Sequence, residues 1–342
     1  MALPPHRLSE GGETDYPWER EAIDFVLQEL PDSDPHLAWP LHELYDAGSG
    51  RLYEIDLLVL ARSALFLIEI KSHPGVLTGD NQDWTFTEAG SSPRHLACPY
   101  PATNHKAKVL ASLLTYKLKG PRPFVQPLVF VSNPETEIQL VGGCPEYVVT
   151  RESIRQTLVH GLPNRPKKTV VNRPMMKDLR RAMRLLGLKP SQANRVAGGF
   201  QLKELIDESE GYQEHHGVST TVSDDIARVR SYLVPKATTT ERRRQLERAA
   251  HREAQVLARL GHHPSILSYR AYETEAPLGP AVVFEAFEGG LPLDAFLKEE
   301  PDLPFDDRLH ILQSVVEAGY HCHRSEFLHG TLSPASVLVR RV

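Results

Sequence analysis

The stretch from Tyr53 to Lys71, Y-E-I-D-L-L-V-L-A-R-S-A-L-F-L-I-E-I-K, constrains the fold of this 342-residue chain more than any other. Its two apolar runs, Ile55–Leu60 and Ala64–Ile70, flank a turn at residues 61–63. Short runs rich in Ile, Leu and Val on both sides of a turn are typical of neighbouring β-strands. The stretch therefore predicts a largely buried hairpin, around which the rest of the domain is organised.

Three charged residues lie within this apolar hairpin: Asp56, Glu69 and Lys71. A buried charge is costly unless it is paired or binds a metal. Glu69 and Lys71 share a face of their strand because they are two residues apart, and Asp56 on the neighbouring strand can point there too. An isolated E-x-K favours a structural ion pair, but the additional Asp56 favours a site that hydrolyses phosphodiesters. Asp56 and Glu69 would hold Mg²⁺, which takes few protein carboxylates, while Lys71 would orient or deprotonate water and stabilise charge on the phosphate.

These residues resemble the PD-(D/E)xK nuclease superfamily, and specifically its nuclease-related (NERD) branch. W-E-R-E-A-I-D-F-V-L-Q-E-L-P, from Trp18 to Pro31, is similar to the first NERD helix, whose glutamate joins the metal site. The resemblance assigns that role to Glu21, with Glu19 as the alternative. The segments S-H-P-G and G-D-N-Q-D-W after Lys71 resemble the turn and hairpin that follow in this branch.

A later segment, N-H-K-A-K-V-L-A-S-L-L (Asn104–Leu114), resembles the next NERD helix, where a polar residue faces the site. Lys106 or Lys108 stands where many relatives carry glutamine, and both are candidate nucleic-acid-binding residues. His73 could also touch the phosphate, although a turn histidine without this role is the simpler interpretation. The resemblance implies Mg²⁺ or Mn²⁺ as cofactor and DNA as substrate, with RNA left open.

Charge and composition set further bounds. The net charge of −5 gives no global attraction to nucleic acid, but residues 101–190 carry sixteen Lys/Arg against five Asp/Glu. Phosphate binding needs only such a local basic face, although a solvated helical surface would look the same. The three cysteines form no C-x-x-C and indicate neither a disulfide framework nor a zinc site. With neither a signal peptide nor a membrane-spanning apolar run, we expect a cytoplasmic protein with no membrane partner and of unknown oligomeric state.

The predicted organisation has four parts. Residues 1–16 form a flexible leader, and residues 17–160 an α/β nuclease-like domain with a mixed sheet flanked by helices. Residues 161–199 form a basic linker with a helix over Met175–Leu188, and residues 200–342 a partial, kinase-like α+β domain. In the nuclease-like domain we expect helices over Pro17–Leu30 and within Pro101–Lys119. Strands are expected near Leu41–Tyr45, Trp84–Glu88, Val125–Ser132 and Glu146–Val149.

The second half resembles the start of a protein-kinase fold with altered motifs. Gly211–Asp225 lacks the closely spaced glycines that cradle phosphates. Arg230 stands where the ATP-contacting lysine belongs, and Glu253, in a helix over Glu241–Leu260, corresponds to the glutamate that pairs with it. Arginine is larger than lysine and forked, so the replacement is not silent.

The catalytic-loop counterpart, L-H-G-T-L-S-P-A-S-V-L-V from Leu328 to Val339, keeps the scaffold residue His329. Thr331 replaces the catalytic aspartate, and threonine cannot take up the substrate proton as a carboxylate does. The chain stops at Val342, before any D-F-G segment. We therefore expect a degenerate kinase-like module or the front part of a longer protein, with ATP as a doubtful ligand.

A NERD domain followed by a kinase-like domain resembles the PglW-type proteins of bacterial BREX phage-defence systems. That resemblance implies restriction of foreign DNA, alone or with other defence-system proteins. The first hypothesis is a metal-dependent nuclease with a catalytically degenerate, regulatory kinase-like module. The alternatives are a non-catalytic module that binds DNA or a partner, and the N-terminal part of a serine/threonine kinase.

Overall fold

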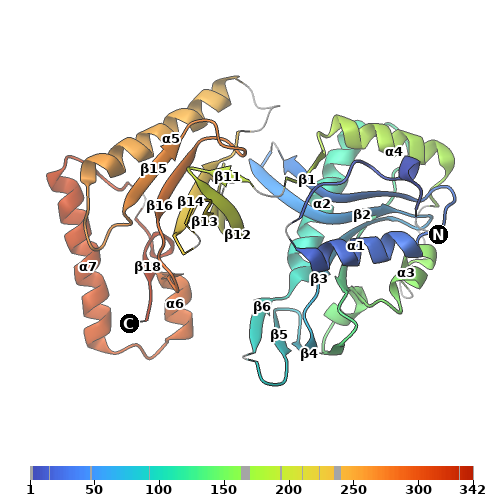
Figure 1. The fold of residues 1–342 in the computed structure, drawn as a ribbon, viewed down its shortest axis with the longest axis horizontal. Helices are drawn as coiled ribbons and strands as arrows, with labels where there is room; N and C mark the ends of the chain where they lie inside the picture. Colours follow the sequence, from blue (N-terminus) through green and yellow to red (C-terminus); the bar gives the residue numbers. More distant parts are fainter. Residues whose placement is uncertain are drawn as a thin grey trace. The chain divides into compact units, whose positions relative to one another are not determined.

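The computed structural model describes residues 3–14, 16–46, 48–91, 93–162, 170–192, 195–209, 211–222, 224–234, 240–330 and 332–341. The chain forms two compact units (Figure 1). Unit 1 comprises Met1–Asp46 with Leu52–Ala193, and unit 2 comprises Ala47–Arg51 with Asn194–Val342. Both units mix helices with sheets, as predicted. The prolines and lysines of the expected linker between residues 163 and 169 lie outside the described residues.

Unit 1 is built on a mixed six-stranded sheet. In spatial order its strands are β10 (Lys189–Pro190), β1 (Leu37–Asp46), β2 (Arg51–Leu60), β3 (Leu65–Lys71), β7 (Val125–Val131) and β9 (Val148–Val149). The predicted hairpin is confirmed, because β2 and β3 pair in antiparallel fashion. On its other side β3 pairs with β7 in parallel, which buries it between two strands. The strand expected over Glu146–Val149 is shorter, since a 3-10 helix occupies Cys144–Tyr147.

Helices cover both faces of this sheet (Figure 1). On one face, α1 (Pro17–Glu29) and α3 (Ile154–His160) pack on a core that includes Leu57 and Phe66. On the other face, α2 (Pro99–Lys117) and α4 (Arg173–Leu185) pack on a core that includes Leu58 and Leu67. The alternation of side chains along β2 and β3 thus feeds two separate cores.

A four-stranded sheet extends unit 1 beyond the end of β3. Its order is β6 (Arg94–Ala97), β5 (Asp83–Thr87), β4 (Gly75–Gly79) and β8 (Thr136–Leu140). The described part of the expected leader runs along unit 1: Leu3 is buried, the 3-10 helix η1 spans Pro5–Arg7, and Leu8 bridges to Ala38. Its apolar side chains account for this packing.

Unit 2 begins with a six-stranded sheet covered by one long helix. The strand order is β11 (Val196–Ala197), β12 (Phe200–Ser209), β13 (Tyr212–Ser219), β14 (Ile226–Tyr232), β16 (Ala281–Glu285) and β15 (Tyr269–Glu273). The helix α5 (Thr240–Leu260) packs on β14, β15 and β16 through small side chains such as Ala254. This order of strands and helix places Arg230 on β14 and Glu253 on α5.

The rest of unit 2 contains α6 (Leu293–Glu299) and α7 (Phe305–Arg324). The short strands β17 (Leu291–Pro292) and β18 (Leu338–Val339) pair, and a 3-10 helix, η3, spans Pro334–Ser336. None of the helices in the described part of the chain has the length and apolar character needed to cross a bilayer.

Candidate active site

The candidate site lies where the β2–β3 hairpin stops being a regular ladder. The two strands pair over four positions, from Leu60 opposite Leu65 to Leu57 opposite Ile68. Beyond them, the backbone N–H of Ile70 donates to Oδ2 of Asp56 at 2.7 Å. The Asp56 side chain thus accepts the hydrogen bond that a backbone carbonyl of β2 would accept in a regular ladder. Its carboxylate is held beside Ile70 near the end of β3.

The orientation of Asp56 depends on a slip in the alternation of β2. Ile55 packs in the same core as Leu58 and Leu60, whereas Leu57 and Val59 pack in the opposite core. In a regular strand Ile55 and Leu57 would share a face. The faces exchange at Asp56, and irregularities of this kind often re-aim a side chain beside a functional site.

Glu69 is the centre of a cluster of charges. Its Oε1 accepts a hydrogen bond from Lys71 Nζ at 2.8 Å, and its Oε2 accepts one from Lys106 Nζ at 3.0 Å. The three side chains are only 15%, 24% and 18% exposed, respectively. Burial alone would raise the pKa of Glu69, but Lys106 and Lys71 outweigh it and lower this pKa to about 2. Glu69 is therefore a carboxylate at neutral pH.

Asp56 is in the opposite electrostatic situation. Burial raises its pKa well above the usual value, and the negative charges of Glu69 and Glu19 raise it further. Burial also raises the pKa of Glu19. The negative charges of Glu54 and Glu69 add to this effect, whereas a hydrogen bond from Thr14 lowers the pKa. The three carboxyl groups of Asp56, Glu69 and Glu19 outnumber the two ammonium groups of Lys71 and Lys106. The cluster has more carboxyl groups than ammonium groups, so a bound proton or a cation would relieve the repulsion among them.

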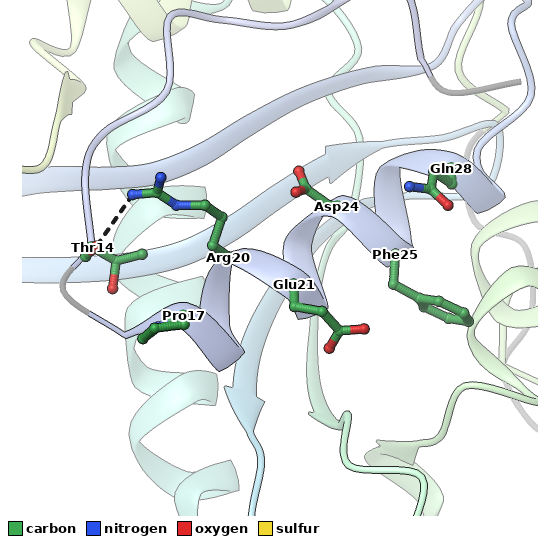
Figure 2. Close-up of a pocket in the computed structure, with 7 residues that line it drawn as sticks. All are labelled: Thr14, Pro17, Arg20, Glu21, Asp24, Phe25 and Gln28. Atoms are coloured by element: carbon green, nitrogen blue, oxygen red, sulfur yellow. Dashed lines mark hydrogen bonds between the residues drawn. The ribbon is translucent and has the colours of Figure 1, made fainter.

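The helix glutamate that faces this cluster is Glu19, the alternative considered from the sequence, and not the first choice, Glu21. Glu19 precedes the buried Ala22 and Ile23 by three and four residues, so all three share the inward face of α1. Glu21 is 56% exposed and accepts hydrogen bonds from Arg151. Figure 2 shows Glu21 with Arg20, Asp24 and Phe25 among the side chains of α1 that line a hollow in the surface. The helical phase of the apolar residues is the sequence signal that distinguishes the two glutamates.

Of the two lysines considered on α2, Lys106 contacts the site and Lys108 does not. Lys106 faces inward, next to the buried Ala107, and pairs with Glu69. Lys108 is exposed. His73 follows β3, and its ring packs edge-on against Phe86 with the centroids 4.8 Å apart. Burial, with Arg94 and Lys71 nearby, lowers the pKa of His73 to about 4, so its ring is neutral at pH 7.

The carboxylate oxygens of Asp56 and Glu69 suit a hard divalent cation, but they do not by themselves complete its coordination sphere. Among the described residues, no three His, Cys, Asp or Glu side chains are arranged as a ready metal cluster. Mg²⁺ requires less, because it commonly takes one or two carboxylates and keeps several waters. Asp56 and Glu69 offer carboxylate oxygens, and the raised pKa of Asp56 reflects its burial first and the negative charges of Glu69 and Glu19 second. The residues therefore fit the group, although Lys71 and Lys106 already contact Glu69.

In unit 2 the counterpart of an ATP site has a different arrangement. Arg230 on β14 forms ion pairs with Glu253 on α5 and with Glu214 on β13. Its guanidinium also lies 4.9 Å from the Tyr212 ring centroid and 5.4 Å from that of Phe284. The expected pairing of Arg230 with Glu253 is present, but a second carboxylate and two aromatic rings surround the same cation.

Glu214 is the residue that inspection of the sequence missed. Its side chain is 1% exposed, and it pairs with Arg228 as well as with Arg230. Glu253 also accepts a hydrogen bond from the Tyr232 hydroxyl at 2.6 Å. Two glutamates and two arginines balance one another, so the network is neutral. Of the remaining candidates, His329 is exposed after α7, and Thr331 lies outside the described residues.

Comparisons with known proteins bear on both units. The family model described as nuclease-related domain, NERD, matches residues 14–132. The model described as protein tyrosine and serine/threonine kinase matches residues 219–342. The chain carries a NERD domain followed by a protein kinase-like domain. The acidic cluster around Glu69 thus belongs to the NERD domain, and the Arg230 network to the kinase-like domain.

Two relatives can be compared with the chain. It is 27% identical over 329 residues, 96% of its length, to a protein of Streptomyces coelicolor named probable kinase PglW. It spans 21% of the length of that protein. The solved kinase domain of PknI from Mycobacterium tuberculosis is 22% identical, with a TM-score of 0.35 over 44% of this chain and 59% of that one.

Proposed function

We propose that the NERD domain is a divalent-metal-dependent nuclease that hydrolyses phosphodiester bonds, with DNA as the expected substrate. The observation that carries the proposal is the convergence of Asp56, Glu69 and Glu19 beside Lys71, with more carboxylates than cations. In this cluster Asp56 and Glu69 would hold Mg²⁺ or Mn²⁺, and Glu19 on α1 would complete the acidic wall. A bound ion of this kind supplies Lewis-acid activation of water and of the phosphate.

The protein side chains perform the remaining tasks. Ile70 N–H fixes Asp56 through its 2.7 Å hydrogen bond. Lys71 reaches 2.8 Å from Glu69, so its ammonium is positioned to orient water and to stabilise the charge that develops on the phosphate. Burial lowers the pKa of Lys71, but Glu69 and Asp56 raise it overall. Lys71 is therefore protonated at neutral pH, and we assign it charge stabilisation, not proton abstraction.

A basic helix face supports nucleic acid as the substrate class. α4 exposes Lys177, Arg180, Arg181 and Arg184, while Asp178 is its only acidic residue. Like charges spaced three and four residues apart repel one another on a helix. A polyanion such as the phosphate backbone would relieve this repulsion.

A cleavage assay tests the proposal. Purified protein is incubated with supercoiled and linear DNA in Mg²⁺ or Mn²⁺, beside Asp56→Asn and Lys71→Ala variants. We expect nicking or linearisation by the wild type that both substitutions abolish. A folded wild type that binds DNA but cleaves it in neither metal would favour the alternative function, a non-catalytic binding module.

For the kinase-like domain we infer a regulatory or docking role in place of phosphoryl transfer. Arg230, the counterpart of the ATP-contacting lysine, is already paired with Glu214 and Glu253. An added triphosphate would have to compete with these carboxylates and approach Glu214. Radiolabel transfer from ATP to a general substrate tests this, and activity above that of an Arg230→Ala protein would refute it.

The order of domains also supports a role in bacterial phage defence, which can be tested in cells. The relative named probable kinase PglW is 27% identical to this chain over an alignment that covers 96% of it and so includes both domains. We infer that the nuclease acts on foreign DNA together with other defence proteins. Plaque counts on cells with the wild-type gene or its Asp56→Asn form test this role, and equal counts would contradict it.

A further inference from the structure

We propose that Lys106 and the divalent cation are alternative counter-ions of Glu69, so that metal binding is coupled to the arrival of a nucleic-acid phosphate. The inference rests on the nuclease function proposed above and adds a way in which that function would be regulated. It concerns the ammonium group that α2 places 3.0 Å from Glu69 Oε2.

Electrostatics make the two cations competitors. The oxygens of Glu69 each accept a hydrogen bond from a different ammonium group, Lys71 on one side and Lys106 on the other. A carboxylate has further lone pairs, so a metal is not excluded by shape. It is opposed by charge, because two positive groups within hydrogen-bond distance of Glu69 repel a divalent ion at the same oxygens.

Lys106 is the ammonium group that can leave. Lys71 lies two residues from Glu69 on the same face of β3, so the backbone keeps the pair together. Lys106 reaches across from α2 on a long side chain, and its pairing depends on that rotamer. In the paired state its side chain is only 18% exposed, and once displaced its ammonium would lack Glu69 as its counter-ion. A phosphodiester entering the site would supply the missing anion.

This exchange predicts positive coupling between metal and nucleic acid. With a divalent ion bound at Glu69, Lys106 would lose its counter-ion and could contribute to phosphate binding beside Lys71. Each ligand favours the arrangement that the other needs, so each tightens the binding of the other by the same factor. Without nucleic acid, the internal Lys106–Glu69 pair keeps metal affinity low.

Mn²⁺ binding, followed by the electron paramagnetic resonance signal of the free ion, tests the proposal. Lys106→Gln should bind Mn²⁺ at least about tenfold more tightly than the wild type without DNA, because one nearby positive charge is removed. The matched control Lys108→Gln, exposed on the same helix, should leave the affinity unchanged. A phosphorothioate duplex that resists cleavage should tighten Mn²⁺ binding to the wild type by on the order of tenfold, and less for Lys106→Gln.

Lys106→Met, which keeps much of the apolar stem, repeats the test, with circular dichroism confirming that each variant is folded. Equal Mn²⁺ affinities of wild type and both Lys106 variants would overturn the proposal, as would a duplex without effect. If the wild type cleaves DNA yet shows neither effect, the nuclease function stands and the exchange fails. If the predicted coupling is measured but no cleavage occurs, the exchange stands and the nuclease function fails.

Discussion

Both domains contain clusters of partly buried charged side chains, but the charges are balanced in one domain and not in the other. In the kinase-like domain, Glu214 and Glu253 meet Arg228 and Arg230, and each carboxylate has a cationic partner. In the NERD domain, two ammonium groups bond the single carboxylate of Glu69, while Asp56 faces Glu69 and Glu19. The first network is closed and neutral, and the second has more carboxyl groups than ammonium groups.

The difference indicates where chemistry takes place. A balanced buried network fixes one arrangement of its members, and breaking it is costly. A cluster of like charges is unfavourable by itself and is relieved by a ligand of opposite charge, which is why perturbed pKa values gather at functional sites. On these grounds we propose that the NERD cluster is the site that takes a ligand, whereas the Arg230 network stabilises its own domain.

The largest expected effect is on DNA cleavage. Asp56→Asn and Lys71→Ala should each lower the rate by on the order of 10²–10⁴-fold. Glu19→Gln should also reduce it, while Glu21→Gln, on the outward face of the same helix, should keep most of it. Plasmid nicking rates measure all four. A large loss with Glu21→Gln and none with Glu19→Gln would contradict the placement of the acidic wall.

The sequence predicted the architecture of this site better than its details. The hairpin and the positions of α1 and α2 follow from local apolar patterns, and the E-x-K motif is visible in the sequence itself. The exchange of faces at Asp56 does not, because regular alternation predicts that Ile55 and Leu57 share a face. Glu19 could have been chosen over Glu21 from its phase with Ile23 and Val26. Glu214 could not be assigned a partner, because the pairing of β13 with β14 depends on register that local sequence leaves open.

The kinase-like network should be sensitive to losing one partner. Glu214→Gln leaves Arg228 and Arg230 without their shared carboxylate and should destabilise this domain by about 2 to 3 kcal/mol, less than a fully buried pair because Arg230 is 27% exposed. All three tryptophans, Trp18, Trp39 and Trp84, lie in unit 1. Urea unfolding should therefore shift in circular dichroism while tryptophan fluorescence is unchanged. A shift confined to fluorescence would contradict this account.

Acid should weaken the kinase-like domain through His215 beside Glu214. Burial and Arg195 lower the pKa of His215 to about 4, against Glu214, which raises it. A depressed histidine pKa gives stability that is present above the unfolded value of 6.5 and is lost as the pH falls toward 4. From pH 7 to pH 5 the loss should be about 2 kcal/mol. His215→Gln should flatten the circular-dichroism profile, and an unchanged slope would exclude this residue as its cause.

The smallest expected effects concern the basic face of α4. Arg181→Gln and Arg184→Gln should weaken DNA binding modestly, and each should lower the dependence of log K on log salt by about one. Fluorescence anisotropy at several salt concentrations measures the slopes. Lys203→Gln, on β12 of the other domain, is the comparison. If all three variants had equal slopes of log K against log salt, the phosphate contacts would not lie on α4.

The central claim is that the NERD cluster carries charge that the fold alone does not neutralise, and urea unfolding of Asp56→Asn followed by tryptophan fluorescence tests it most directly. Asparagine can still accept the Ile70 N–H bond and, like a protonated aspartate, carries no negative charge. In metal-free buffer at pH 7, we expect Asp56→Asn to unfold at the same or higher urea, with a gain of up to about 1 kcal/mol. A clear loss of stability in unit 1 would show that Asp56 belongs to a balanced network like that of Glu214, and would contradict the account.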